Sequence, residues 1–118
     1  MKPKKLIRDK VPALILEREY ETIEDKAELN RLYALKVREE LAEIQHAHHK
    51  DILEFADLVE VAYCFAEQNG FSKEEIDLAM LGKYEKKGRF SNIALNNLNP
   101  QNPSNMLYFV DNYNYKTP

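Results

Sequence analysis

The chain has little glycine and almost no cysteine, and each scarcity excludes a class of protein. Its 118 residues include three glycines, which lie too far apart for a phosphate loop of the G-x-x-x-x-G-K-[ST] or G-x-G-x-x-G type. The single cysteine excludes a disulfide framework within the chain, and it suits a reducing, cytoplasmic setting. If the protein handles phosphates, it must hold them with side chains and metal ions.

Long apolar runs and a large net charge are also missing. No stretch approaches the ~20 apolar residues of a membrane span, and no apolar signal core follows the basic N-terminus. A net charge of -3 argues against a general nucleic-acid binder. We therefore expect neither a membrane nor a nucleic-acid polymer as a partner. At 44% hydrophobic residues, the chain can bury a core as one domain.

The spacing of apolar residues predicts helices along most of the chain. Four segments show this spacing or a helix-start signal: 12–19, 25–47, 51–68 and 72–87. Ser72 and Glu75 form a capping box, and Gly70 and Gly88 are stop signals. The sequence therefore predicts an all-α fold, an antiparallel helical bundle of about three main helices plus a short N-terminal helix.

The segment 51–68 is apolar on most of its circumference, which is typical of a helix at the centre of a bundle or at a subunit interface. We expect a four-helix-bundle-like core that is completed in a homodimer or homotetramer. From about residue 91 the composition changes, with eight of the ten Asn and three of the five Pro. We divide the chain into an all-α domain over 1–92 and an irregular tail over 93–118, in which 106–110 forms a short docked piece or edge strand.

Acidic residues are concentrated in the middle of the chain. Residues 39–60 hold seven acidic side chains and one basic one, and basic clusters lie near the N-terminus and near residue 86. The acidic pattern is E-E-x-x-E followed by E-x-x-D, that is Glu39, Glu40, Glu43, Glu54 and Asp57. Residues three or four apart share a helix face, so each group of carboxylates lies on one face of its helix.

The short connection between the two helices predicts that they are antiparallel neighbours. If the turn is centred between His48 and His49, Glu43 lies opposite Glu54, and Glu40 lies opposite Asp57. Facing carboxylates repel one another unless they are protonated or a cation lies between them. Oxygen ligands favour Mg²⁺, with Mn²⁺ as an alternative, and Mg²⁺ is usually shared with substrate phosphates. The alternative interpretation is a pair of solvated acidic faces, although such faces usually alternate in sign.

Two further motifs flank the acidic pattern: Lys5-Leu-Ile-Arg-Asp-Lys-Val-Pro12 before it and Lys83-Tyr-Glu-Lys-Lys-Gly-Arg-Phe90 after it. Together the three motifs resemble the all-α nucleotide pyrophosphohydrolases, the MazG-like superfamily. The acidic pattern is similar to the signature of that superfamily, and the flanking segments resemble the KLVRDKIP start and the K-x-E-x-R-G-x-F segment of its phosphoribosyl-ATP pyrophosphatase-like branch. The resemblance covers about residues 4–92.

This resemblance implies a Mg²⁺-dependent enzyme that cuts a nucleoside triphosphate between the α and β phosphates, giving a monophosphate and pyrophosphate. A house-cleaning role for the enzyme is compatible with this reaction. It implies that the metal ligands are Glu40, Glu43, Glu54 and Asp57. The resemblance also implies catalytic roles for Glu39 and Glu40. Glu39 would be a metal ligand or the group that orients the attacking water. Phosphate contacts fall to Arg8, Lys10, Lys83, Lys86, Lys87 and Arg89. The alternative is a non-catalytic oligomerisation or partner-binding module with an acidic, cation-binding face.

Other reactive residues suit structural roles better. His46, His48 and His49 fit a solvated turn, with transition-metal binding as the weaker alternative, and Cys64 fits a buried thiol because no base lies beside it in the sequence. Tyrosines such as Tyr33 and Tyr63 are expected in the core or at an interface.

Overall fold

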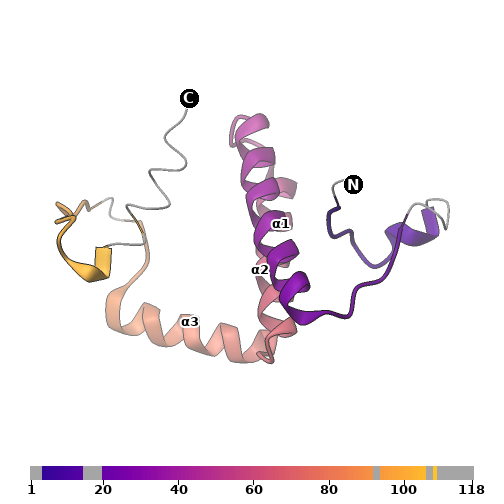
Figure 1. Ribbon diagram of the computed structural model, residues 1–118. Coiled ribbons are helices and arrows are strands. Elements are labelled where there is room, and N and C mark those ends of the chain that lie inside the picture. The colour runs from indigo at the N-terminus through magenta and orange to yellow at the C-terminus, as the bar shows by residue number, and fades with distance from the viewer. Residues whose placement is uncertain (1–3, 15–19, 92–93, 106–107, 109–118) are drawn as a thin grey trace. The chain divides into compact units, whose positions relative to one another are not determined.

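The computed structural model describes residues 4–14, 20–91, 94–105 and 108. Within this part of the chain the elements are the 3-10 helix η1, three α-helices and the 3-10 helix η3, with no strand (Figure 1). Their bounds are Val11–Leu14 for η1, Lys26–His46 for α1, Ile52–Gln68 for α2, Lys73–Lys87 for α3 and Pro103–Asn105 for η3. The all-α prediction is confirmed, and the three main helices begin and end close to their predicted positions.

Side-chain caps explain where the helices begin. The Asp25 carboxylate accepts a hydrogen bond from the Ala27 amide at 3.3 Å, and the Asp51 carboxylate accepts one from the Leu53 amide at 2.9 Å. At the start of α3, Ser72 Oγ accepts from the Glu75 amide and Glu75 Oε1 accepts from the Ser72 amide, both at 3.1 Å. Each cap satisfies amides that have no partner within the helix, and the predicted capping box is confirmed.

Residues with left-handed backbone end the helices. Gly70 follows α2 with φ of 92°, and Gly88 follows α3 with φ of 76°, a region that glycine enters without a steric penalty. Between α1 and α2 the left-handed positions are His48 and His49, with φ of 57° and 61°. These two residues lie at the predicted centre of the turn, so α2 runs back along α1.

Helices α1 and α2 form an antiparallel hairpin, which is the one extensive helix–helix contact in the described part of the chain (Figure 1). The rings of Tyr33 and Phe65 stack with their centroids 5.2 Å apart, and Asn69 Nδ2 donates to Asn30 Oδ1 at 2.9 Å. Among the described apolar side chains only Leu32 and Ile44 are buried, and both belong to α1. The hairpin alone therefore encloses a very small core.

Helix α2, predicted to lie at the centre of a bundle or at a subunit interface, is largely open to solvent in one chain. None of its described residues is buried, and Ile52 is 79% exposed and Val59 53% exposed. One chain supplies α1 as a neighbour to α2 along its length, whereas a helix that is apolar nearly all round needs neighbours on several sides. The bundle and its oligomeric completion therefore stay predictions.

The first half of α3 contacts α2 through polar groups. The Tyr63 hydroxyl donates a hydrogen bond to the Asp77 carboxylate, and Lys73 Nζ lies 3.2 Å from the other Asp77 oxygen. Lys73 Nζ also lies 5.0 Å from the centroid of the Tyr63 ring. Tyr63 is therefore a partly buried contact between helices, in line with the structural role expected of it.

Two sequence predictions meet the structure only in part. The predicted α-helix that begins at Pro12 is a 3-10 helix over Val11–Leu14, and residues 15–19 lie outside the described residues. Of the predicted short piece at 106–110, only Tyr108 is described. Contacts within the chain group it into two units, residues 1–83 and 84–118. No helix in the described segments is long and apolar enough to cross a membrane.

Candidate metal centre

Four carboxylates meet between α1 and α2, and we call Glu40, Glu43, Glu54 and Asp57 the carboxylate cluster. One oxygen from each lies within 4.8 Å of the oxygens of the other three. Glu40 and Glu43 are one turn apart on α1, and Glu54 and Asp57 are one turn apart on α2. The predicted pairing across the hairpin therefore brings the predicted ligand set together, because the turn at His48 and His49 sets the register.

Glu40 is the most enclosed member of the cluster. The residue is 4% exposed, which is rare for a carboxylate, and its Oε2 is buried without a hydrogen-bond partner in the described structure. Its other oxygen, Oε1, lies 3.5 Å from Lys36 Nζ. A buried oxygen without a donor is costly, so Glu40 Oε2 needs a proton or a cation as its partner.

Two carboxylates of the cluster, Glu40 and Glu54, hold protons more tightly than ordinary ones. Burial raises the pKa of Glu40, and the charge of Glu43 raises it further. The pKa of Glu54 is also raised, first by its hydrogen bond to Glu43 and then by burial and by the charges of Glu43 and Asp57. Glu54 Oε2 is a second buried oxygen with no partner in the described segments. Burial and the interaction with Glu43 contribute to both shifts.

This donor set fits a divalent cation. Carboxylate oxygens are the ligands that Mg²⁺ and Mn²⁺ prefer, and the two partnerless oxygens belong to members of the cluster on different helices. A cation would satisfy these oxygens and offset the repulsion that adds to the two raised pKa values. The alternative interpretation as fully solvated acidic faces is therefore wrong for Glu40, which is buried.

Glu39 lies outside the carboxylate cluster and is neutralised by lysines. Its Oε1 accepts a hydrogen bond from Lys5 Nζ at 2.9 Å, and its Oε2 accepts one from Lys36 Nζ at 3.2 Å. Partial burial opposes ionisation of Glu39, but the two hydrogen bonds outweigh it and lower its pKa. Glu39 therefore stays ionised, whereas the pKa values of Glu40 and Glu54 are raised.

Lys36 is a part of the site that the sequence analysis missed. Its side chain is 16% exposed, and it bridges Glu39 and Glu40 from positions three and four residues earlier on α1. The spacing alone could have indicated this contact, because residues at these separations are neighbours on a helix surface. Lys36 fixes one oxygen of Glu40 and leaves the other facing the cluster.

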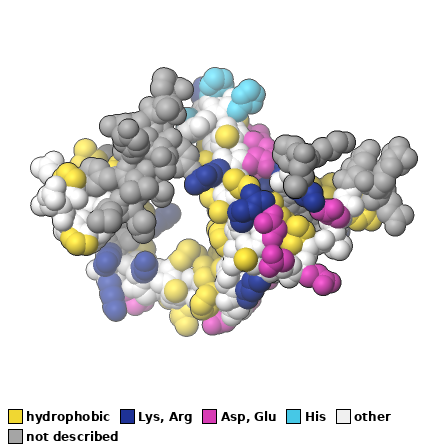
Figure 2. All heavy atoms as spheres, viewed as in Figure 1, with side chains coloured by type: hydrophobic (Ala, Val, Ile, Leu, Met, Phe, Trp, Pro, Cys, Tyr) yellow, Lys and Arg dark blue, Asp and Glu magenta, His cyan; other side chains and the backbone are white. Residues whose placement is uncertain are grey.

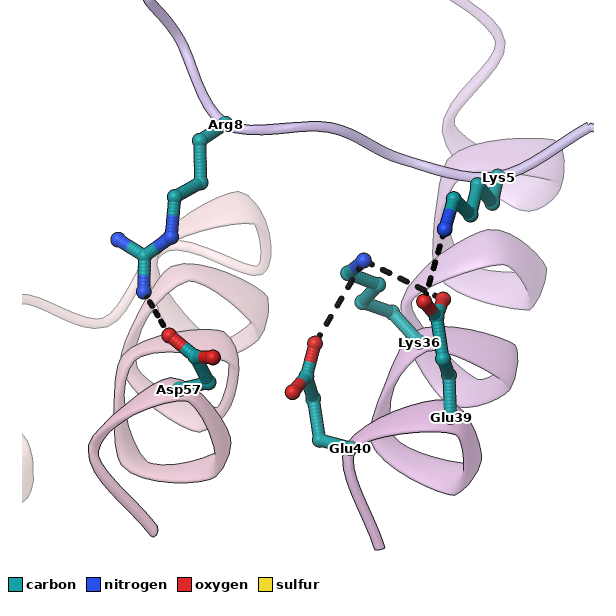
Figure 3. Close-up of polar contacts among 6 residues, drawn as sticks. All are labelled: Lys5, Arg8, Lys36, Glu39, Glu40 and Asp57. Carbon is teal, nitrogen blue, oxygen red and sulfur yellow. Dashed lines mark hydrogen bonds and ion pairs between the residues drawn. The ribbon is translucent and has the colours of Figure 1, made fainter. Parts of the chain in front are cut away.

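The basic N-terminal segment reaches the site through two ion pairs. Lys5 contacts Glu39 on α1, and the Arg8 guanidinium donates a hydrogen bond to Asp57 Oδ1 on α2 (Figure 3). The pKa of Lys5 is raised by its hydrogen bond to Glu39 and by the nearby charges of Glu43 and Glu40. Figure 2 shows the same mixture on the surface, where Lys and Arg side chains lie beside acidic ones on the hairpin.

The predicted phosphate-binding residues differ in whether they contact the carboxylate cluster. Arg8 is tied to the site by Asp57, whereas Lys10 is exposed and forms no ion pair within the described residues. The remaining predicted phosphate contacts, Lys83, Lys86, Lys87 and Arg89, are exposed on the last turns of α3 or just after it. None of these four is ion-paired to any residue that the structure describes, and nothing there tests their predicted role.

The other reactive residues take structural positions. His46, His48 and His49 are exposed at the end of the hairpin, as expected for a solvated turn. Cys64 is partly buried, and its Sγ lies 3.5 Å from Glu60 Oε1. Burial, followed by the hydrogen bond and charge of Glu60, raises the pKa of the Cys64 thiol to about 11. The thiol is therefore protonated near neutral pH, which excludes it as an activated nucleophile.

No protein-family model matches the chain, and no curated protein or solved structure matches it at a significant level.

Proposed function

We propose that the protein is a Mg²⁺-dependent nucleoside triphosphate pyrophosphohydrolase. The observation that carries the proposal is the carboxylate cluster, whose four oxygens lie within 4.8 Å of one another, with two buried oxygens that have no donor among the described residues. Further support comes from the order of the three sequence motifs, which resembles that of the MazG-like superfamily. The reaction would yield a nucleoside monophosphate and pyrophosphate.

In this proposal Glu40, Glu43, Glu54 and Asp57 hold Mg²⁺, or Mn²⁺ in its place. A bound divalent ion would supply an activated water and would neutralise charge on the phosphates. Glu39 is the group that orients the attacking water, since Lys5 and Lys36 keep its carboxylate ionised and able to accept a hydrogen bond from that water.

The chemical step balances with groups of the chain and solvent. The water oxygen forms a new bond to phosphorus, and the anhydride bond between the α and β phosphates breaks. The proton of the water passes to solvent, and pyrophosphate leaves with its charge offset by basic side chains. We assign that last role to Lys83, Lys86, Lys87 and Arg89, from the same subunit or its neighbour, together with Arg8 and Lys10.

We also propose that the active form is a homodimer or homotetramer. The apolar stripe of Ile52, Phe55 and Val59 on α2 is exposed to solvent in one chain. Pairing α1–α2 hairpins from two chains would bury such stripes and give a four-helix core. The stripe would equally suit a non-catalytic oligomerisation or partner-binding module that carries an acidic, cation-binding face.

A pyrophosphate-release assay tests the enzymatic proposal. A panel of standard and damaged nucleoside triphosphates is incubated with the protein and Mg²⁺, and separately with Mn²⁺, and both pyrophosphate and orthophosphate are measured. We expect at least one nucleotide to give equal amounts of monophosphate and pyrophosphate, and we expect EDTA to stop the reaction. If no nucleotide releases pyrophosphate with either metal, the enzymatic proposal fails and the non-catalytic module is favoured.

A further inference from the structure

Two basic side chains of one short N-terminal segment form ion pairs with the two helices of the hairpin. Lys5 pairs with Glu39 on α1, and Arg8, three residues later, pairs with Asp57 on α2. Figure 3 shows the backbone from Lys5 to Arg8 passing over the carboxylates between these contacts. We call residues 5–8 the latch, because the segment joins both sides of the carboxylate cluster.

The contact at Asp57 places a cation of the chain on a predicted metal ligand. Asp57 belongs to the carboxylate cluster, and Arg8 occupies its Oδ1. A carboxylate oxygen that accepts a hydrogen bond from a guanidinium has less electron density for a metal ion, and the positive charge also repels a divalent cation. The Arg8 guanidinium and the metal therefore compete for the same carboxylate.

The ion pairs of the latch are open to solvent and can exchange. The Arg8 side chain is 61% exposed and that of Asp57 is 32% exposed. Exposed pairs of this kind are weak, because water and salt screen them and ordering two long side chains costs entropy. A divalent ion that is held by several carboxylates should displace such a pair.

We propose that the latch is a built-in competitor of the metal: Arg8 holds Asp57 in the metal-free chain, and a divalent cation releases Arg8 and loosens residues 5–8. The inference rests on the proposed metal centre. Under this inference the protein's own N-terminal segment regulates metal binding. Binding of the metal would also free the Arg8 guanidinium beside the site.

Titration with Mn²⁺ of variants in the latch tests the competition. Arg8→Gln removes the competing charge, and Lys10→Gln is the matched control, because Lys10 is an exposed cation two residues away without an ion pair in the described structure. We expect Arg8→Gln to bind Mn²⁺ about two- to fivefold more tightly than the wild type at low salt, and Lys10→Gln to bind like the wild type. Equal Mn²⁺ affinity in Arg8→Gln and Lys10→Gln would overturn the proposal.

Limited digestion with trypsin separates failure of the latch from failure of the metal centre. In the metal-free protein, Arg8→Gln and Asp57→Asn should each speed cleavage after Lys5 by about two- to fivefold, and Lys10→Gln should not. Unchanged cleavage in both variants would overturn the latch even if Mn²⁺ binds normally. Faster cleavage in both variants, without Mn²⁺ binding to the wild type, would support the contact and refute the metal centre on which the competition depends.

Discussion

Replacement of Glu43 with glutamine is expected to reduce Mg²⁺-dependent pyrophosphate release by at least about 100-fold while raising the melting temperature of the metal-free protein. The loss of activity follows from the loss of a metal ligand, since even groups that only orient metal ligands typically contribute about 10- to 100-fold. The gain in stability follows because Glu43 is the charged neighbour that raises the pKa of both Glu40 and Glu54. One substitution should therefore move activity and stability in opposite directions.

The effect on stability should depend on pH in a definite direction. A carboxylate with a raised pKa binds its proton more tightly in the folded state, so its contribution is complete below the ordinary pKa and is lost as the pH rises through the raised pKa. The melting temperature of the metal-free wild type should therefore fall from about pH 5 to about pH 8. Mg²⁺ should restore it at the upper end, and Glu43→Gln should flatten the profile. Glu39 has a lowered pKa and loses its contribution only below this window.

Thermal unfolding and pyrophosphate release measured on the same preparations check this prediction. Glu67→Gln is the matched control, because it removes one negative charge from an exposed position on α2 outside the cluster. We expect Glu67→Gln to keep both the activity and the pH profile of the wild type. A Glu43→Gln protein that remains fully active, or that is less stable than the wild type at the upper pH, would show that the four carboxylates do not act together.

Introduction of a charge on the apolar stripe of α2 should separate the subunits. In Val59→Asp, a carboxylate replaces an apolar side chain that one chain leaves 53% exposed. Burial of a valine contributes about 1.5 to 3 kcal/mol, and in a symmetric dimer each substitution acts twice. We expect the dissociation constant of the oligomer to rise by about 100-fold or more, and the melting temperature to depend less on protein concentration.

Light scattering at micromolar protein concentration measures this change. Gln45→Asp adds the same charge at an exposed polar position of α1, and it should leave the oligomer intact. If the wild type is strictly monomeric under these conditions, the proposed homodimer or homotetramer is wrong. If Val59→Asp and the wild type have the same mass, the stripe on α2 is not the interface.

The course of the helices could be predicted from the sequence because their ends are determined locally. Asp25, Asp51 and Ser72 cap helices with their own side chains, and Gly70 and Gly88 adopt the left-handed backbone that ends α2 and α3. These signals act over a few residues and need no distant contact. The N-terminal helix was less predictable, because Pro12 is compatible with the first turn of both α- and 3-10 helices.

The carboxylate cluster could be predicted because a short turn fixes the register of two helices. Once His48 and His49 turn the chain, the pairing of Glu43 with Glu54 and of Glu40 with Asp57 follows from helix geometry. The burial of Glu40 and the ion pair between Arg8 and Asp57 could not be predicted in this way. The ion pair depends on where a segment without regular structure lies across the helices, and no local signal determines that path or the burial of Glu40.

Anomalous diffraction at the manganese absorption edge, from wild-type crystals grown with Mn²⁺, tests the metal centre most directly. We expect an anomalous peak bounded by carboxylate oxygens of Glu40, Glu43, Glu54 and Asp57, with Asp57 no longer paired to Arg8. Crystals in which Mn²⁺ is absent from the space between α1 and α2, although it is present in the solvent at millimolar concentration, would contradict the proposed metal centre.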